Sequence, residues 1–155
     1  MNKPSKGSPG VSGELSVVFE PANEAAKLFV TDGIANYNIA TTGLAAYYPV
    51  GYFLRSKDDE ILGGLHGAIW GKWLYIKIFW IAEPARGKGY GRQMLSRAEA
   101  YAVERDCIGA HLETFSFQAR PLYEKLGYAV FGEIRDYPPG HTFYFMKKRF
   151  ATEAG

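Results

Sequence analysis

The most apolar stretch of the chain, residues 73–82, predicts a buried strand. It reads WLYIKIFWIA and is apolar at almost every position. A run that is apolar on both faces is typical of a strand covered on both sides, in the interior of a sheet. A glycine-rich turn follows at residues 86–91, and after it apolar residues recur at helical spacing. The stretch therefore predicts a buried strand, a glycine loop and an amphipathic helix in succession.

Similar patterns predict the other elements. Further strands are expected at residues 14–20, 51–55, 61–70, 110–115, 128–135 and 142–150. One helix should run from an N-cap at Asn23 to about Ile39, and another from about Gln118 to Leu126, with Gly127 just after its end.

The order of these elements predicts a mixed α+β fold. A helix separates strand 110–115 from strand 73–82, so these two strands should be parallel, while the first three strands of the sheet should be antiparallel. We expect one domain over residues 14–150. Residues 1–13, rich in Gly, Ser, Pro and Lys, should be a disordered arm, and residues 151–155 a tail.

Composition excludes several classes of protein. The net charge of +2 is too small for a dedicated nucleic-acid binder. A single cysteine, Cys107, excludes an internal disulfide framework and fits a reducing compartment. No segment resembles a secretion signal or a membrane span, so we expect a soluble, cytoplasmic protein without a membrane partner. No cluster of His, Cys, Asp and Glu has metal-ligand spacing, so no metal is expected.

The glycine loop has the chemistry of a phosphate cradle. The first turn of a helix leaves N–H groups without partners, at the positive end of the helix dipole. Glycines at 87, 89 and 91 allow close approach of a ligand, and Arg86, Lys88 and Arg92 add positive charge. The spacing fits neither G-x-x-x-x-G-K-[ST] nor the dinucleotide pattern G-x-G-x-x-G.

Two motifs resemble those of the GCN5-related N-acetyltransferase (GNAT) superfamily. Arg86, Gly89 and Gly91 fill the pattern R-x-x-G-x-G of its acetyl-CoA pyrophosphate loop. A second segment, residues 116–128, is similar to N-x-x-A-x-x-L-Y-x-K-x-G-[FY], with Ser116 where the family often has Asn. The residues that match the second motif are Ala119, Leu122, Tyr123, Lys125, Gly127 and Tyr128.

The resemblance implies a mixed, mostly antiparallel sheet of about six to seven strands, flanked by helices. Its two parallel central strands splay apart, and acetyl-CoA enters the V-shaped cleft. The pantetheine arm pairs with the edge of strand 73–82, whose N–H groups near residues 80–82 would also face the thioester oxygen. The residues implied to bind the cofactor are Trp80, Ile81, Ala82, Arg86, Gly87, Lys88, Gly89, Tyr90, Gly91, Arg92 and Ser116.

The resemblance also implies direct transfer of the acetyl group, without a covalent enzyme intermediate. Tyr123 stands where the family has a tyrosine beside the sulfur, and a phenol, protonated at neutral pH, can donate a proton to the departing thiolate. Its alternative role is packing, since it lies on an apolar stripe. Glu113 is the candidate general base, and its alternative is an ion pair with a basic neighbour. His111 and His141 are weaker candidates.

The acceptor in this family lies between the first helical region and the loop that joins the last two strands. These segments contain Tyr37, Tyr48, Asp136 and His141, and aromatic rings beside an acidic group suit a cationic amine. Alternatively, the tyrosines fill the core or cover the surface of a homodimer.

We therefore predict an acetyl-CoA-dependent N-acetyltransferase that acts on a primary amine. A small molecule is favoured because no acidic face is evident for docking basic tails. The alternatives are a protein or histone-like N-acetyltransferase and, from another class, an acyl-CoA-binding sensor without catalysis.

Overall fold

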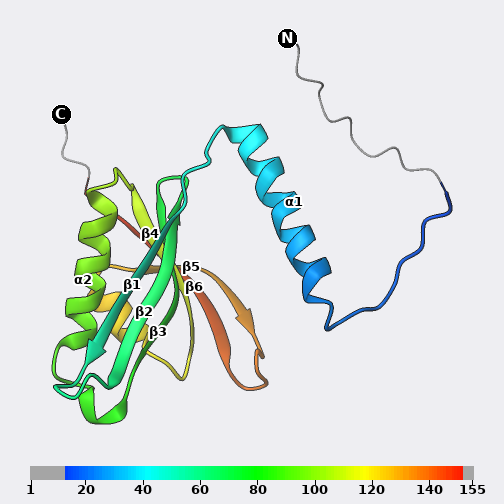
Figure 1. Cartoon of the computed structure of the whole chain (residues 1–155). Helices are drawn as coiled ribbons and strands as arrows, with labels where there is room; N and C mark the ends of the chain where they lie inside the picture. Colours follow the sequence, from blue (N-terminus) through cyan, green and yellow to red (C-terminus); the bar gives the residue numbers. More distant parts are fainter. Residues whose placement is uncertain (1–12, 152–155) are drawn as a thin grey trace. The chain divides into compact units, whose positions relative to one another are not determined.

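The computed structural model describes residues 13–151, and contacts divide the chain into two units, residues 1–43 and 44–155. The predicted arm of residues 1–13, apart from Gly13, and the last four residues of the predicted tail lie outside the described residues. We describe each unit by itself (Figure 1).

The first unit contains one helix, α1 (Glu24–Thr42). Asn23 caps it, because its Oδ1 accepts a hydrogen bond from the Ala26 N–H at 2.9 Å. Gly43 ends the helix in the left-handed conformation, at φ 70°. The helix predicted from Asn23 is therefore confirmed. The strand predicted at residues 14–20 is wrong, because the structure assigns no strand there. The residues favour an extended backbone, but a strand also needs a neighbour to pair with, which local sequence cannot supply.

The second unit is built on a six-stranded sheet in the order β1-β2-β3-β4-β6-β5. The pair β3–β4 is parallel and the other pairs are antiparallel, which confirms the predicted fold class. The strands are β1 (Tyr48–Arg55), β2 (Ile61–Trp70), β3 (Trp73–Ile81), β4 (Gly109–Phe115), β5 (Ala129–Arg135) and β6 (Thr142–Arg149).

Two α-helices belong to this unit. Helix α2 (Tyr90–Val103) follows a 3₁₀ turn (Glu83–Ala85) and lies along β1, β2 and β3 (Figure 1). Helix α3 (Arg120–Lys125) is shorter than the helix predicted at residues 118–126, and Gly127 follows it at φ 91°. No helix within residues 13–151 is both long and apolar enough to cross a membrane.

The two parallel strands pair over only part of their length. Residues 73–76 of β3 pair with residues 109–112 of β4, and beyond them no pairing continues. A β-bulge explains the divergence: His66 of β2 faces Ile78, and Gly67 faces Ile76, so Lys77 has no partner on β2. A bulge bends its strand and shifts which side chains face the core. The end of β3 therefore leaves β4 and opens one side of the sheet.

The core lies between α2 and one face of the sheet. Leu95 and Ala98 of α2 are at most 1% exposed and pack with Leu74 of β3 and Leu112 of β4. On the opposite face of β3, Ile78 and Trp80 are 52% and 56% exposed. Within the unit of residues 44–155, β3 is therefore covered on one face, not on both as its apolar run predicted. An apolar run shows that burying both faces of the strand is favourable, but it does not show which segment of the protein covers them.

The helix–sheet core predicts a large effect of Leu95→Ala on stability. Removing a side chain that is 1% exposed leaves a cavity against the sheet, so the free energy of unfolding should fall by about 2–5 kcal/mol. Urea denaturation measures this change. Val103→Ala, in the same helix at 51% exposure, is the matched control and should change it by at most about 0.5 kcal/mol. Equal effects of the two substitutions would contradict this account of the core.

Candidate active site

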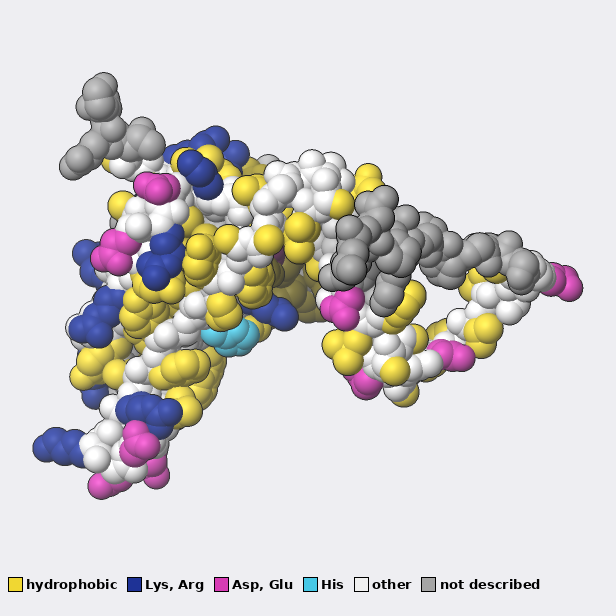
Figure 2. Space-filling model, turned by 45° about the horizontal axis from the view of Figure 1, so that its top comes forward, with side chains coloured by type: hydrophobic (Ala, Val, Ile, Leu, Met, Phe, Trp, Pro, Cys, Tyr) yellow, Lys and Arg dark blue, Asp and Glu magenta, His cyan; other side chains and the backbone are white. Residues whose placement is uncertain are grey.

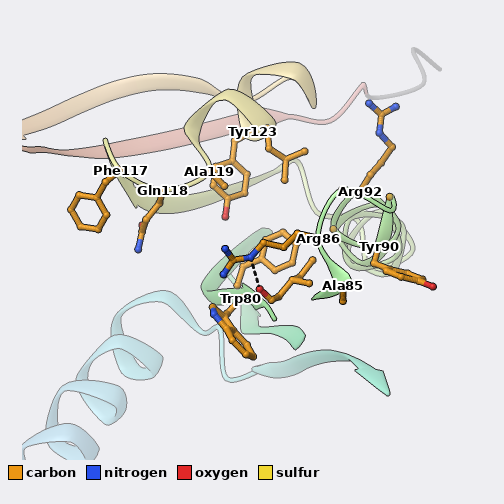
Figure 3. Close-up of a pocket in the computed structure, with 15 residues that line it drawn as sticks. Trp80, Ala85, Arg86, Tyr90, Arg92, Phe117, Gln118, Ala119 and Tyr123 are labelled. Carbon is orange, nitrogen blue, oxygen red and sulfur yellow. Dashed lines mark hydrogen bonds between the residues drawn. The ribbon is translucent and has the colours of Figure 1, made fainter. Parts of the chain in front are cut away.

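A cavity of about 640 Å³ opens where β3 and β4 diverge (Figure 3). One wall is the end of β3, residues 79–81. The facing wall is the segment after β4, with Phe117, Gln118 and Ala119, and the side of α3 that carries Leu122 and Tyr123. The glycine loop and the first turn of α2 line the rest. The cavity thus follows directly from the divergence of the two strands.

Three glycines of the loop, Gly87, Gly89 and Gly91, line the cavity at the start of α2. Gly87 and Gly89 have φ values of 71° and 86°, a conformation that non-glycine residues rarely adopt, and Gly89 is the N-cap of α2. Among the described residues, none accepts a hydrogen bond from the N–H groups of Gly87 through Gly91. Together with the helix dipole, these free donors can hold a phosphate or pyrophosphate group.

Arg86 has a different role from the glycines that follow it. Its own N–H is bonded to the Glu83 carbonyl at 3.1 Å, so the run of free amides begins at Gly87. Its side-chain Nε donates to the Ile81 carbonyl at 2.8 Å, which draws the guanidinium into the cavity (Figure 3). The side chains of Tyr90 and Arg92 point away from Tyr123 in the same view.

At the end of β3, only part of the backbone faces the cleft. The Ala82 N–H donates to the Leu62 carbonyl at 2.8 Å, on the side of β2. In an antiparallel pair, the backbone groups of successive residues alternate between the two sides of the strand. Ile81 therefore directs its N–H and carbonyl away from β2, toward the diverging β4, and Ala82 does not. Trp80 and Ile81 line the cavity, and Ala82 does not.

Tyr123 lies in the cavity wall with its hydroxyl pointing into the cavity (Figure 3). The residue is 6% exposed, and its ring contacts those of Phe79 and Tyr128 at centroid distances of 6.3 and 6.1 Å. Burial raises the pKa of Tyr123 to about 12, because the charged phenolate is disfavoured away from water. The phenol is therefore a proton donor at neutral pH.

Besides Ala82, two predicted cofactor residues do not line the cavity. Lys88 lies in the glycine loop but is absent from the cavity wall. Ser116 is engaged with the β5–β6 loop: its Oγ accepts a hydrogen bond from the Thr142 N–H at 3.2 Å and lies 3.4 Å from His141 Nδ1. The hydroxyl thus ties the end of β4 to the start of β6.

Glu113 lies at the apex of the splay, just beyond Leu112, the last residue of β4 that pairs with β3. Its partner is a phenol, not a basic residue: Tyr75 Oη donates to Glu113 Oε2 at 2.8 Å. Burial and this hydrogen bond raise the pKa of Tyr75 to about 12. His111 stacks on Tyr75 at 4.7 Å, and its pKa is lowered by burial, with an opposing effect of Glu113. Glu113 is not among the residues that line the cavity.

The four predicted acceptor residues separate in the structure. His141 is near the cavity, because its ring packs against Phe117 at 4.8 Å. Asp136 lies in the same loop, where its Oδ1 accepts from the Gly140 N–H at 3.3 Å. Tyr48 is not brought to the cavity: its ring faces Arg105, beyond the C-terminal end of α2. Tyr37 belongs to α1 in the other unit, and its role stays a prediction.

Sequence reasoning missed two residues that follow β4. Phe117 and Gln118 both line the cavity (Figure 3). Gln118 Oε1 accepts hydrogen bonds from the Phe115 N–H at 2.9 Å and from Thr114 Oγ1 at 3.2 Å, which fixes the turn after β4. The second motif leaves these positions unspecified, and their place in the wall depends on the divergence of β3 from β4.

Comparison with known proteins assigns the family. A model of the Acetyltransferase (GNAT) family matches residues 21–128. The chain therefore belongs to the GNAT family and is an acetyl-transferring enzyme. This membership confirms the fold class and the co-substrate of the class, acetyl-CoA, that the two motifs predicted.

Three relatives illustrate the similarity. Blasticidin-S acetyltransferase of Streptomyces morookaense is 42% identical over 90 residues, which cover 57% of this chain and 66% of that protein. A crystal structure of an acetyltransferase from Bacillus cereus has a TM-score of 0.76 at 30% identity and covers 86% of this chain and 98% of its own. A structure from Bacillus anthracis, described as a streptothricin acetyltransferase in complex with acetyl coenzyme A, has a TM-score of 0.59 at 21% identity, over 67% and 64% of the two chains. This last likeness concerns the fold alone.

No group of three or more His, Cys, Asp and Glu side chains within residues 13–151 is arranged to hold a metal ion.

The geometry of the glycine loop predicts that Gly89→Ala weakens cofactor binding. An alanine at φ 86° is strained by about 1–2 kcal/mol, and the loop can relieve this strain by turning an amide away from the cavity. Calorimetric titration with acetyl-CoA should show a Kd about tenfold higher. Gly71→Ala is the matched control, since Gly71 is also left-handed, at φ 56°, in the turn between β2 and β3. An unchanged Kd for Gly89→Ala, or an equal change in the control, would contradict binding of acetyl-CoA by the glycine loop.

Proposed function

We propose that this enzyme transfers the acetyl group of acetyl-CoA to the primary amine of a small molecule, by direct attack of the amine on the thioester. One observation carries the proposal: Gly87, Gly89, Tyr90 and Gly91, whose N–H groups have no acceptor among the described residues, line the same cavity as Tyr123. If the loop N–H groups hold the diphosphate and the Tyr123 hydroxyl lies near the thioester, one extended molecule runs along the opening between β3 and β4.

The described residues fit acetyl-CoA in both charge and shape. The N-terminus of α2 supplies free donors and the dipole for the pyrophosphate, and Arg86 adds a positive charge inside the cavity wall. The outward carbonyl of Ile81 can accept from an amide N–H of the pantetheine arm, provided that the Arg86 side chain releases it. A volume of about 640 Å³ is within the range of ligand cavities.

Each step of the transfer has a candidate group in the chain. Acetyl-CoA, when bound, supplies the thioester that the amine attacks. The Ile81 N–H can donate to the thioester oxygen as negative charge develops on it. As the carbon–sulfur bond breaks, Tyr123 donates its phenolic proton to the thiolate, and its raised pKa keeps that proton in place until then.

Glu113 is proposed as the base that takes the proton from the attacking ammonium, directly or through water. The support is its place at the apex of the splay and the Tyr75 hydrogen bond that orients its carboxylate. Since Glu113 does not line the cavity, a bridging water is the route that agrees with its position.

A small molecule is favoured as the acceptor for two reasons. The relative that is 42% identical over 90 residues is named for acetylation of an antibiotic, blasticidin S. On the surface of the second unit that Figure 2 shows, acidic side chains are scattered among basic and apolar ones, so no continuous acidic surface is presented to a basic peptide. Phe117, in the cavity wall, and His141, which packs against it, are on the side where the amine would enter.

The test is release of free thiol from acetyl-CoA with a panel of amines. The wild type should turn over at least one small amine. Tyr123→Phe should lower kcat about 100-fold, because the thiolate loses its proton donor, with little change in the KM for acetyl-CoA. Tyr52→Phe, in β1 and outside the cavity wall, is the matched control.

The same assay separates the alternatives. Glu113→Gln should lower kcat as well, and an unchanged kcat would remove Glu113 from the role of base. Turnover of basic peptides alone would identify a protein acetyltransferase. Tight acetyl-CoA binding without turnover of any amine or peptide would identify a sensor.

The pKa of Tyr123 predicts the alkaline side of the pH profile. The protonated phenol is the active form and its pKa lies at about 12, so this form persists throughout the alkaline range of an ordinary assay. We expect kcat to show no fall that depends on Tyr123 between about pH 7 and about pH 10. The measurement compares the profiles of the wild type and Tyr123→Phe. A descending limb below about pH 10 that disappears in the variant would contradict the assignment.

A further inference from the structure

The helix that carries Tyr123 cannot hold its own position. Helix α3 spans residues 120–125, only six residues, and a helix of this length is not stable by itself in water. The position of the Tyr123 hydroxyl therefore depends on whatever fixes α3 against the rest of the unit. Arg120, at the start of α3, lies over the Tyr144 ring of β6 at 4.3 Å. Two further contacts, at separate points, join α3 and the segment after it to helix α2.

The first point lies at the start of α2. A side chain at Gly91 would come within 3.6 Å of Leu122 Cδ2 and 3.5 Å of Phe79 Cζ, so α3 packs closely against the first turn of α2. This contact is apolar and can slide, because dispersion forces have no preferred direction. It brings α3 near the glycine loop but does not fix its rotation.

The second point is directional and runs through Tyr128. The Tyr128 N–H donates to the Tyr123 carbonyl at 3.0 Å, and the two rings meet edge to face at 6.1 Å. Tyr128 Oη donates to Glu99 Oε1 of α2 at 2.9 Å. Tyr128 is 3% exposed, so its hydroxyl depends on this acceptor rather than on water.

Glu99 is in turn held from a third element. Lys148 Nζ, on β6, donates to Glu99 Oε2 at 2.6 Å, and the side chains of Lys148 and Glu99 are 26% and 15% exposed. Both carboxylate oxygens are thus engaged, one by a phenol and one by an ammonium group. Such charge-assisted hydrogen bonds are short and directional. The network joins α2, the segment after α3 and β6 at a single carboxylate.

We propose that Glu99 and Tyr128 are positioning residues that hold the Tyr123 hydroxyl in register with the glycine loop. The inference rests on the proposed function, in which Tyr123 protonates the departing thiolate. Helix α2 is the common reference: it begins at the loop that binds the diphosphate, and Glu99 lies about 15 Å further along its axis. Helix α2 would thus position both the diphosphate, through its first turn, and the Tyr123 hydroxyl, through Glu99 and Tyr128. Rotation of α3 would then move the Tyr123 hydroxyl away from the sulfur without disturbing the diphosphate.

The test uses Tyr128→Phe, which keeps the ring and removes the hydrogen bond to Glu99. A displacement of about 1 Å of a catalytic group can cost up to about 100-fold in rate, so we expect kcat to fall about tenfold or more. The KM for acetyl-CoA should stay within about twofold, since the loop is unchanged. Tyr101→Phe, which also removes a phenol next to the core, on α2, should leave kcat unchanged.

A double-mutant cycle distinguishes positioning from general stabilisation. If Tyr128 acts through Tyr123, adding Tyr128→Phe to Tyr123→Phe should cause no further loss of kcat. An equal loss in both backgrounds would overturn the inference, as would an unchanged kcat for Tyr128→Phe. If Tyr123→Phe itself keeps full kcat, the proposed acid and this inference both fail. A loss in Tyr123→Phe without one in Tyr128→Phe overturns the inference alone.

If Tyr128→Phe does not fold, a pair of variants at Glu99 tests whether the hydrogen bond between Tyr128 and Glu99 positions Tyr123. Glu99→Gln keeps a side-chain oxygen that can accept from Tyr128 Oη, whereas Glu99→Leu removes the acceptor. We expect Glu99→Gln to retain several times more kcat than Glu99→Leu, at similar KM for acetyl-CoA. Equal kcat values for the two variants would show that kcat does not depend on a hydrogen-bond acceptor at position 99, and would overturn the inference.

Discussion

The structure of the catalytic unit depends on one local event, the loss of pairing between β3 and β4 after Ile76. Up to that residue the two strands form an ordinary parallel ladder. The bulge at Lys77 then bends β3, and its last residues face β4 across the cavity instead of bonding to it. The Ile81 N–H that would have continued the ladder thereby becomes available, while the Ile81 carbonyl accepts from Arg86 Nε at 2.8 Å. A ligand can take the place of the missing strand, which is how an extended pantetheine arm would be accommodated.

Helix α2 converts this opening into a site with two distinct ends. Its first turn supplies free N–H groups for an anion, and its body supports the short helix that carries Tyr123. Burial of Leu95 and Ala98 against the sheet keeps α2 fixed. The same packing energy that stabilises the unit therefore also sets the relation between the anion cradle and the phenol. The polar contacts of Glu99 add direction to a contact that apolar packing alone would leave loose.

Several features could be predicted from local sequence because their causes are local. The conformation of Gly87 and Gly89 and the N-terminus of α2 follow from residue types and spacing, and so does the cap at Asn23. Other features could not. Tyr48 stood in a plausible segment, yet the pairing of β1 with β2 places it near Arg105. Phe117 and Gln118 gave no signal, because only the diverging strands make their segment a wall.

The sequence by itself determined the order of the strands and α-helices after Asn23, the position of the glycine loop and the tyrosine that the family motif marks. These depend on hydrophobic period and on backbone preferences that act over a few residues. Tertiary structure alone decided which groups are engaged with the protein and which remain free. The Ala82 and Arg86 amides are bonded within the chain, those of Gly87 through Gly91 find no acceptor within residues 13–151, and Glu113 has a phenol as its partner. Hydrogen-bond partners far apart in the chain meet only when the strands are paired, so no local pattern encodes them.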